Sequence, residues 1–425
     1  MDPKLKRTTV WLSLTAAICL PDVVAAQQPD VDDPDPNITV QDRPRPDYDP
    51  LGIRAGSFFI FPSLTLSGQY DSNVFATNDD EDSDVGVIVA PNVEVNSNWS
   101  RHALNFAAGA AAAAFADFSQ NNYLDAYAAT TGELDVLRSD IVSGTLRIDR
   151  LHEDRDDADD GEDTIVGGDD DNEGNLTRYY RGLVDTQYRH NFARFFTVVG
   201  GGVQRLWFED IGDREESIRD RNEYGGRARV GFPISPRFGT FAEGRYSYRD
   251  YDDLDRNSHG YRASAGVSVD FTSILFGEMA LSYSKRDYTN DDLNDPSGFG
   301  ANGSVTWNVT PLTSIILDAR SEIDETTVTF EGDVAEANFE NSVGLDVNHE
   351  LLRNLLLNAN ARYTREDFEG TSRTDDIYSV GAGASYLINR NFSLDATYRF
   401  TKRDSDSDSA EFDRNIVLLG ITAKL

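Results

Sequence analysis

Residues 390–400, with the sequence RNFSLDATYRF, decide the fold class of this chain. The segment begins at a polar turn, alternates apolar side chains with polar or small ones, and ends on aromatic side chains. Residues 353–363 (RNLLLNANARY) and 236–246 (PRFGTFAEGRY) follow the same plan, and each copy continues into an acidic run. Alternation with a period of two over about ten residues is typical of a β-strand with one apolar and one polar face.

Short polar turns and longer, mostly acidic connections alternate from residue 53 onwards. Short turns are expected at residues 96–102, 137–140, 191–194, 233–237, 270–273, 308–312, 350–354 and 388–391. Longer connections are expected at residues 71–84, 117–122, 152–175, 209–220, 250–258, 287–297, 324–334, 366–376 and 403–410. This alternation implies about 18 strands whose first and last members start and end on the short-turn, periplasmic side. The pattern predicts an all-β fold, a transmembrane antiparallel up-and-down β-barrel over residues 53–425 with short periplasmic turns and long acidic extracellular loops.

The first 52 residues do not fit the strand pattern. Three basic residues precede an apolar segment at residues 8–20, and small residues before Gln27 offer a cleavage site. We therefore expect a signal peptide at residues 1–26. Residues 27–52 are rich in proline and aspartate and lack periodicity, which predicts a disordered periplasmic leader.

Composition narrows the classes of function. The 425-residue chain carries 74 acidic and 39 basic residues, a formal net charge of −35, so it would repel the phosphates of nucleic acid. Its one cysteine, Cys19, lies in the expected signal peptide, which leaves the mature chain no disulfide and no thiolate metal site. Mean hydropathy is −0.48, and beyond the N-terminal region no stretch approaches the roughly 20 apolar residues of a spanning helix. A barrel avoids that requirement because inward-facing polar residues dilute its apolar ones.

The alternation also assigns the two faces of the strands. Outward we place the face that carries Tyr261 and Phe271, and the face that carries Tyr378 and Tyr386. Tyrosines at these strand ends would form an aromatic girdle at the membrane interfaces. The opposite phase carries arginines, each of which would cost roughly 2–4 kcal/mol if it faced lipid at mid-membrane. We therefore expect a polar lumen lined by Arg147, Arg181, Arg227, Arg229, Arg245, Arg262, Arg320, Arg362 and Arg399, with Arg189 in the same phase.

Two interpretations of these arginines are open. Arginine–carboxylate ladders could hold neighbouring strands in register along a solvated wall. Alternatively, the arginines could form a basic track that favours an anionic solute. The two arrangements can coexist in one barrel.

The acidic connections also admit two interpretations. Residues 154–171 are rich in the carboxylates that Ca²⁺ binds, but EF-hand spacing is absent, so solvated surface loops are the simpler interpretation. We predict no metal site and no cofactor. The connection at residues 152–175 is the candidate constriction or lid because of its length. The sequence contains neither a Gly-x-Ser-x-Gly elbow nor a His-Glu-x-x-His motif, and we predict that the protein is not an enzyme.

Several early motifs carry a resemblance to a known family. They are YDPLGIR at 48–54, FPSL at 61–64, YDSNVFAT at 70–77, Pro91, WSRH at 99–102 and NY at 122–123. On these residues the chain resembles the putative β-barrel porin 2 family of outer-membrane proteins in Gram-negative bacteria. The resemblance implies an outer-membrane barrel, often associated with exopolysaccharide or capsule production and export. It supplies no binding residues.

Together these observations predict a multi-pass, porin-like channel of the outer membrane, either for polysaccharide export or for passage of anionic solutes through the arginine-containing lumen. The alternative is a non-conducting barrel that acts as a structural or surface-interaction protein through its acidic loops. The expected partners are outer-membrane lipid and lipopolysaccharide, the barrel assembly machinery and polysaccharide export components, and not nucleic acid.

Overall fold

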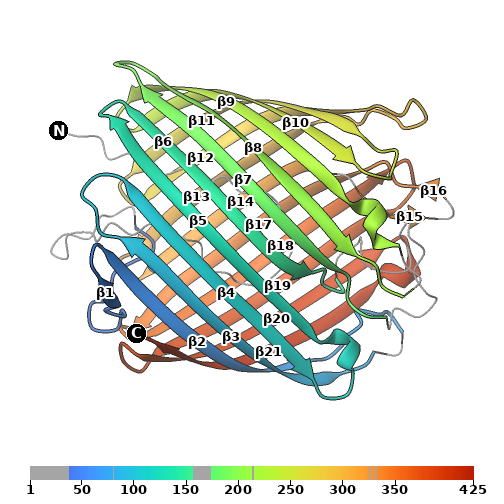
Figure 1. Ribbon diagram of the computed structural model, residues 1–425, viewed down its shortest axis with the longest axis horizontal. Helices are drawn as coiled ribbons and strands as arrows, with labels where there is room; N and C mark the ends of the chain where they lie inside the picture. Colours follow the sequence, from blue (N-terminus) through green and yellow to red (C-terminus); the bar gives the residue numbers. More distant parts are fainter. Residues whose placement is uncertain are drawn as a thin grey trace.

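The wall of the molecule is a barrel of long strands (Figure 1). The computed structural model describes residues 38–79, 81–156, 174–212, 215–324, 326, 328–330 and 333–425. The wall strands are β2 (Phe58–Asp71), β3 (Asp84–Ser97), β4 (Ala103–Phe115), β5 (Tyr123–Leu137), β6 (Asp140–His152), β7 (Arg178–Asn191), β8 (Phe196–Glu209), β9 (Arg221–Ser235), β10 (Phe238–Tyr251), β11 (Ser258–Thr272), β12 (Leu275–Tyr288), β13 (Ser297–Thr310), β14 (Thr313–Asp324), β17 (Ala337–Leu352), β18 (Leu355–Glu369), β19 (Thr374–Leu387), β20 (Phe392–Ser405) and β21 (Phe412–Lys424).

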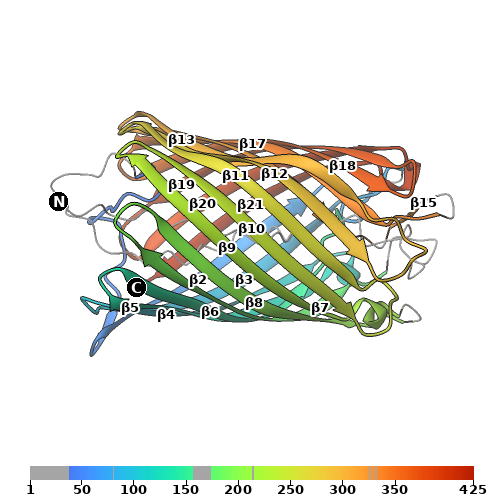
Figure 2. The same cartoon turned by 90° about the horizontal axis from the view of Figure 1, so that it is seen from above.

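Each wall strand pairs in antiparallel fashion with the next one in the sequence, and the sheet closes on itself. The closing pair is β2 with β21, from Ser63 opposite Lys424 to Asp71 opposite Ile416. The strands cross the wall obliquely, and β1 and the C-terminus lie at the same end of the barrel (Figures 1 and 2). The predicted fold, an antiparallel barrel of 18 strands, is confirmed.

Smaller elements decorate the two ends of the barrel. β1 (Ile53–Ala55) pairs with the start of β2 on the short-turn side. β15 (Thr329–Phe330) and β16 (Asp333–Val334) form a hairpin in the long connection between β14 and β17. Three short 3₁₀ turns, η1 (Ser119–Asn121), η2 (Glu216–Arg219) and η3 (Asp408–Ala410), lie in other long connections. In the part of the chain that the structure describes, no helix is long and apolar enough to cross a membrane.

The outward face of the wall is apolar and bare. Phe299 is 87% exposed and Leu281 is 72% exposed, because no layer of protein covers them. Tyr261, Phe271 and Tyr378 are exposed as well, so the outward phase predicted for their strands is confirmed. Such an apolar surface suits contact with lipid, whereas in water a continuous exposed apolar surface would favour aggregation.

The strands run further into the acidic segments than the sequence analysis predicts. β10 includes Asp250 and Tyr251, and the connection expected at residues 366–376 shrinks to residues 370–373. Gly370 has a φ of +89°, the left-handed conformation that this tight turn requires. Beyond the lipid, water solvates a charged side chain on a strand at little cost. Acidic composition therefore marks where the membrane ends and not where the strand ends.

Residues 38–50 lie against the barrel, in contrast to the disordered leader predicted for residues 27–52. The backbone N–H of Val40 donates a hydrogen bond of 2.8 Å to Ser314 Oγ, and both residues are buried. Asn308 in turn donates to the carbonyl oxygen of residue 38 at 3.2 Å. A proline-rich segment without secondary structure can still be ordered by hydrogen bonds to a neighbouring surface. The prediction of disorder is therefore wrong for this part of the leader.

The same segment continues along the short-turn rim. Arg45 pairs with Glu350 of β17 at 3.3 Å, and Arg390, in the turn between β19 and β20, donates two hydrogen bonds to the carbonyl oxygen of Pro46. The leader thus connects the ends of β13, β14, β17 and β20 across the periplasmic mouth. The expected signal peptide at residues 1–26 and the leader residues 27–37 lie outside the described residues.

Candidate functional site in the barrel interior

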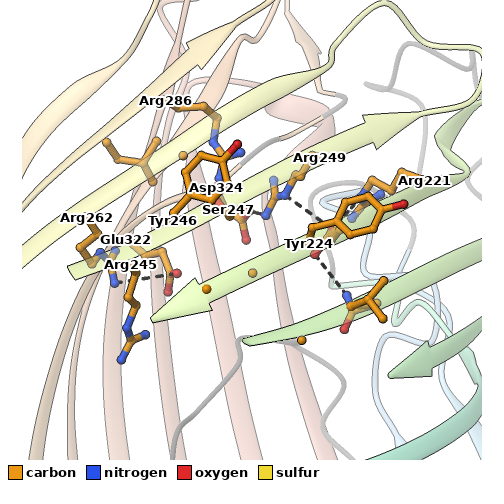
Figure 3. Close-up of a pocket in the computed structure, with 18 of the residues that line it drawn as sticks. Arg221, Tyr224, Arg245, Tyr246, Ser247, Arg249, Arg262, Arg286, Glu322 and Asp324 are labelled. Carbon is orange, nitrogen blue, oxygen red and sulfur yellow. Dashed lines mark hydrogen bonds and ion pairs between the residues drawn. The ribbon is translucent and has the colours of Figure 1, made fainter. Parts of the chain in front are cut away.

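A cavity of about 450 Å³ lies against the inner side of the wall between β7 and β17 (Figure 3). The arginines that line it are Arg219, Arg221, Arg227, Arg245, Arg249, Arg262, Arg286 and Arg320. The carboxylates that line it are Glu153, Asp185, Glu223, Glu322, Asp324 and Glu340. Guanidinium groups therefore outnumber carboxylates in this lining, whereas the chain as a whole is strongly acidic.

Three of these arginines stand side by side on neighbouring strands. Arg245 of β10 is directly opposite Arg227 of β9 on one side and Arg262 of β11 on the other. We refer to these three residues as the arginine row. Strands in a sheet are about 4.8 Å apart, and like charges directly opposite one another are destabilising. A row of this kind therefore concentrates positive charge at one level of the wall.

Each member of the row has partners elsewhere. Arg227 pairs with Asp185 of β7 at 3.0 Å, and Arg245 pairs with Glu243 of its own strand at 2.5 Å. Arg262 donates to Ser284 Oγ at 2.9 Å and to the carbonyl oxygen of residue 321 at 3.1 Å. The side chain of Arg245, in the middle of the row, is 40% exposed. It is the member whose guanidinium is most accessible to a solute.

Ion pairs nearer the long loops span several strands. Arg249 of β10 pairs with Asp324 of β14 at 2.5 Å and lies 3.5 Å from Glu223 of β9. Arg221 pairs with the same Glu223 at 2.8 Å. Contacts between β10 and β14 pass over three intervening strands, which only the concave inner face permits (Figure 3). These pairs link strands across the concave inner face on this side.

Nearer the short turns, Arg229 of β9 pairs with Glu278 of β12 at 2.5 Å and stacks 3.7 Å above the ring of Phe241. Arg189 of β7 stacks in the same way over Phe196 at 4.0 Å. Planar stacking and multiple donors favour arginine over lysine at such positions. Together with the row and Arg249, these residues extend arginine side chains along much of the length of the wall.

The predicted site residues do not all meet in one place. The cavity brings together Arg227, Arg245, Arg262 and Arg320, and Arg229 lies beside it. Arg147 and Arg181 both pair with the buried Asp149 at 2.7 Å, and Arg362 pairs with Asp318 at 3.0 Å. Arg399 lies on β20, opposite Gly381 and Ile416. Several of these contacts are the arginine–carboxylate links between strands that a register-holding role requires.

Sequence reasoning missed four arginines of the cavity, Arg219, Arg221, Arg249 and Arg286. All four lie in or beside segments that were interpreted as acidic loops. A signal was present, because Arg249 continues the phase of Arg245 and Arg286 continues the phase of Ser284. Extending the period-two pattern through the charged residues would have found both.

The wall on the other side of the barrel is different. β2, β3, β4 and β5 contain neither arginine nor lysine. The inner face of β4 is built from small residues such as Ala107, Gly109 and Ala113. We refer to β2–β5 as the cation-free wall.

A buried arginine joins this wall to the last strand. Arg414 of β21 pairs with Asp71 of β2 at 2.7 Å and with Asp154, at the start of the longest connection, at 2.9 Å. Burial by itself would raise the pKa of the Asp154 carboxyl, but the charges of Arg414 and His152 hold that pKa well below its usual range. Of the candidate constriction at residues 152–175, residues 157–173 lie outside the described part.

No group of three or more histidine, cysteine, aspartate or glutamate residues within the described ranges is arranged to hold a metal ion. The functional candidates in the described interior are therefore the charged side chains themselves.

Comparison with known proteins agrees with this architecture. A model of the family described as "Putative beta-barrel porin 2" matches residues 45–425. The chain belongs to this family. It is a porin-like β-barrel channel of the outer membrane, as the sequence analysis predicts. No curated protein matches the chain.

Solved structures with a similar arrangement include OpdL, a BenF-like porin and a receptor. OpdL of Pseudomonas aeruginosa is 12% identical, with 87% of this chain and 100% of that chain covered and a TM-score of 0.46. A BenF-like porin of Pseudomonas fluorescens Pf-5 is 12% identical, with 86% and 99% covered and a TM-score of 0.46. A mutant of the ferric enterobactin receptor PfeA of Pseudomonas aeruginosa is 7% identical, with 86% and 80% covered and a TM-score of 0.47. At these TM-scores the similarity carries no argument about function.

Proposed function

We propose that this porin-like channel passes anionic solutes, and that the arginines of the inner wall select them. The observation that carries the proposal is the arginine row, in which Arg227, Arg245 and Arg262 face one another across two strand pairs. Placing like charges opposite one another costs stability, so a structural role alone gives little reason for it. A solute with negative charge would relieve that repulsion as it passes.

The proposed selection is electrostatic and involves no bond chemistry. A channel lined by one sign of charge between low-dielectric walls raises the local concentration of counter-ions. The solute must bind weakly enough to leave, which suits side chains that already share their charge with a carboxylate. The pairs of Arg245 with Glu243 and of Arg227 with Asp185 would keep each guanidinium oriented without holding the anion permanently.

The experiment is the reversal potential of the refolded protein in a planar bilayer under a KCl gradient. The variant Arg227→Gln, Arg245→Gln, Arg262→Gln is expected to lose most of the anion preference and to keep its conductance. The control variant Arg150→Gln, Arg365→Gln, Lys402→Gln removes the same charge from side chains in the opposite, outward phase, outside the residues that line the cavity, and should keep the preference. Unchanged selectivity in the row variant would refute the proposal. A wild-type protein that does not conduct would favour the surface-interaction alternative.

Polysaccharide is the solute class that the family resemblance suggests, and the arginines of the lumen favour an acidic one, so we propose acidic polysaccharide as the larger anion to be tested. A carboxylated oligosaccharide added to one side of the bilayer should interrupt the current, and the row variant should weaken that block. A neutral oligosaccharide of the same length serves as the matched ligand. Equal block by both sugars would show that the pore retains them by size and does not select them by charge, which would contradict the proposal.

A further inference from the structure

β13 and β14 pair along only part of their length. Their ladder ends at Gly303 opposite Ala319, before the long-loop ends of the two strands. Beyond that point residues 297–302 of β13 pair with β12, and residues 320–324 of β14 pair with β17. Within these two described segments, no ladder pair joins β13 to β14. We refer to this interruption of the wall as the seam.

At the seam the ends of β14 and β17 pass inside β13. Gly298 and Gly300 have the inward phase on β13, because Phe299 between them is outward and 87% exposed. A Cβ atom at Gly300 would lie only 2.7 Å from the Cβ atom of Ser321 of β14. A Cβ atom at Gly298 would lie 2.9 Å from the ring of Phe339 of β17. The two glycines therefore leave room for a second layer of strands on the lumen side.

Side chains, and not a ladder, bond the backbone of β14 at the seam. The N–H of Ser321 donates to Asn302 Oδ1 at 3.3 Å, and the Ser321 carbonyl oxygen accepts from Arg262 at 3.1 Å. Further along β14, Asp324 pairs with Arg249 of β10 across the inner face (Figure 3). A backbone edge cannot face hydrocarbon without hydrogen-bond partners. These side-chain contacts therefore keep the seam closed.

The seam lies at the depth of the outer leaflet. The outward side chains of β13 run from Trp307, near the short turn, to Phe299, whose ring centroid is 5.1 Å from that of Tyr283. This nine-residue span matches the roughly 9–11 tilted residues that cross the hydrocarbon core of a bilayer, so Phe299 marks the extracellular boundary. Gly303, where the ladder ends, is in the middle of the span. The seam therefore separates the lumen from the lipid tails of the outer leaflet.

We infer that the seam is a lateral outlet through which an amphipathic anion, with one charged head and an alkyl chain, passes between the lumen and the outer leaflet. Arg262 belongs to the arginine row and also holds the carbonyl oxygen of Ser321. An anionic head is a stronger acceptor than a carbonyl oxygen, so its binding to Arg262 would release Ser321 and loosen the seam. The cavity that contains the row also reaches Ile323, an apolar side chain of β14 at the seam. This inference rests on the proposed anion selectivity and names a solute class for it.

The first variant locks the seam with a disulfide. The mature chain is expected to contain no cysteine, so Gly300→Cys, Ser321→Cys adds a single pair across the seam. The Cβ atoms of a disulfide are about 3.8 Å apart, so the bond forms after a shift of about 1 Å. The matched control Thr306→Cys, Ile316→Cys places its pair on the same two strands where the ladder joins them. Oxidation and reduction then compare the locked and free forms of one protein.

The readout is photolabelling in nanodiscs by dodecyl phosphate that carries a photoreactive group at the end of its chain, mapped by peptide mass spectrometry. Phe299 is exposed on the outward face and serves as the reference. We expect the wild type to carry label at Asn302 and Ile323, at the seam. The oxidised seam variant should lose this label and regain it on reduction, whereas oxidation of the control pair should have no effect. Dodecanol with the same photoreactive group has no charge and should label Phe299 alone.

A second variant, Asn302→Ala, keeps the test decisive if the double-cysteine protein fails to fold. It removes the acceptor of the Ser321 N–H, so the label at Ile323 should increase. Unchanged seam label in the locked form or in Asn302→Ala overturns the inference, and so does equal seam label by the phosphate and the alcohol. The reversal potential of the same proteins reports anion preference separately. Anion preference without seam label refutes the outlet alone, whereas a wild-type channel without anion preference refutes the proposed function on which the outlet rests.

Discussion

Two walls of the lumen differ in the side chains that cover their inner faces. β9–β12 carry seven arginines, all of them inward in phase, and most of them pair or stack with residues of neighbouring strands. The cation-free wall, β2–β5, carries none, and it fills its inner surface with small residues and a few hydrogen bonds. At Gly109 a Cβ atom would lie only 2.7 Å from the ring of Tyr127, whose hydroxyl donates to Asn92 at 2.6 Å.

This difference shows that neighbouring strands can keep their register without an arginine on each strand. Backbone ladders and close packing hold most of the cation-free wall, and its charged contacts come from residues outside it, such as Arg414. The arginines of the other wall are therefore in excess of what closure requires, which is the reason to look for a ligand there. The following predictions test that contrast, from the largest expected effect to the smallest.

Arg414 of β21 is a buried cation that pairs with Asp71 of the cation-free wall. Arg414→Ala would leave Asp71, which is completely buried, without its partner, and should destabilise the barrel by about 3–5 kcal/mol. Arg245→Ala removes a 40% exposed side chain from the other wall and should cost less than about 1 kcal/mol. Urea unfolding of the two refolded variants in detergent would measure both values. Similar losses would show that the walls do not differ in this way.

Arginines added to the cation-free wall should increase anion preference. Thr65 and Ala111 have inward phase on β2 and β4, so Thr65→Arg, Ala111→Arg would face the lumen opposite the arginine row. We expect the permeability ratio of chloride to potassium to rise about twofold, by added counter-ion attraction. The variant Thr65→Gln, Ala111→Gln changes side-chain size without charge and controls for narrowing. A ratio that stays at the wild-type value would show that position within the row matters and total charge does not.

Acid should affect the junction at Arg414 only at low pH. The pKa of Asp154 is held below its usual range in the folded protein, so the pair stabilises the fold above the unfolded value of about 3.9. That contribution is lost as pH falls through the lower, folded-state pKa. The stability difference between wild type and Asp154→Asn should therefore stay constant from pH 7 to about pH 5 and shrink below about pH 4. A difference that already disappears near pH 6 would contradict this assignment.

The fold could be predicted from local pattern, because most wall strands show a period of two and most turns are polar, although the phase of the alanine- and glycine-rich β4 and β8 was ambiguous. The faces followed from the same period, as Tyr261 and Tyr378 show. The arginine row could not be predicted, because phase gives the face of a residue but not its neighbour on the next strand. That Arg245 stands opposite Arg227 and Arg262 depends on register, which the turn geometry and the stagger of the barrel set together.

Two other features escaped prediction for different reasons. Arg249 and Arg286 were hidden because charge was interpreted as the end of a strand, although water outside the membrane tolerates both. The leader was misjudged because its composition describes the isolated segment. Its order comes from partners such as Ser314, which the sequence near Val40 does not reveal.

The positions of these hydrogen-bond partners in the chain also determine when the leader can bind during folding. Val40 bonds a residue 274 positions later in the chain, and Pro46 accepts from a residue 344 positions later. The earliest described segment therefore cannot settle until nearly all of the strands exist and lie side by side. A protease that cuts the unbound leader but not the bound leader would then report that the chain has assembled at least as far as the turn between β19 and β20.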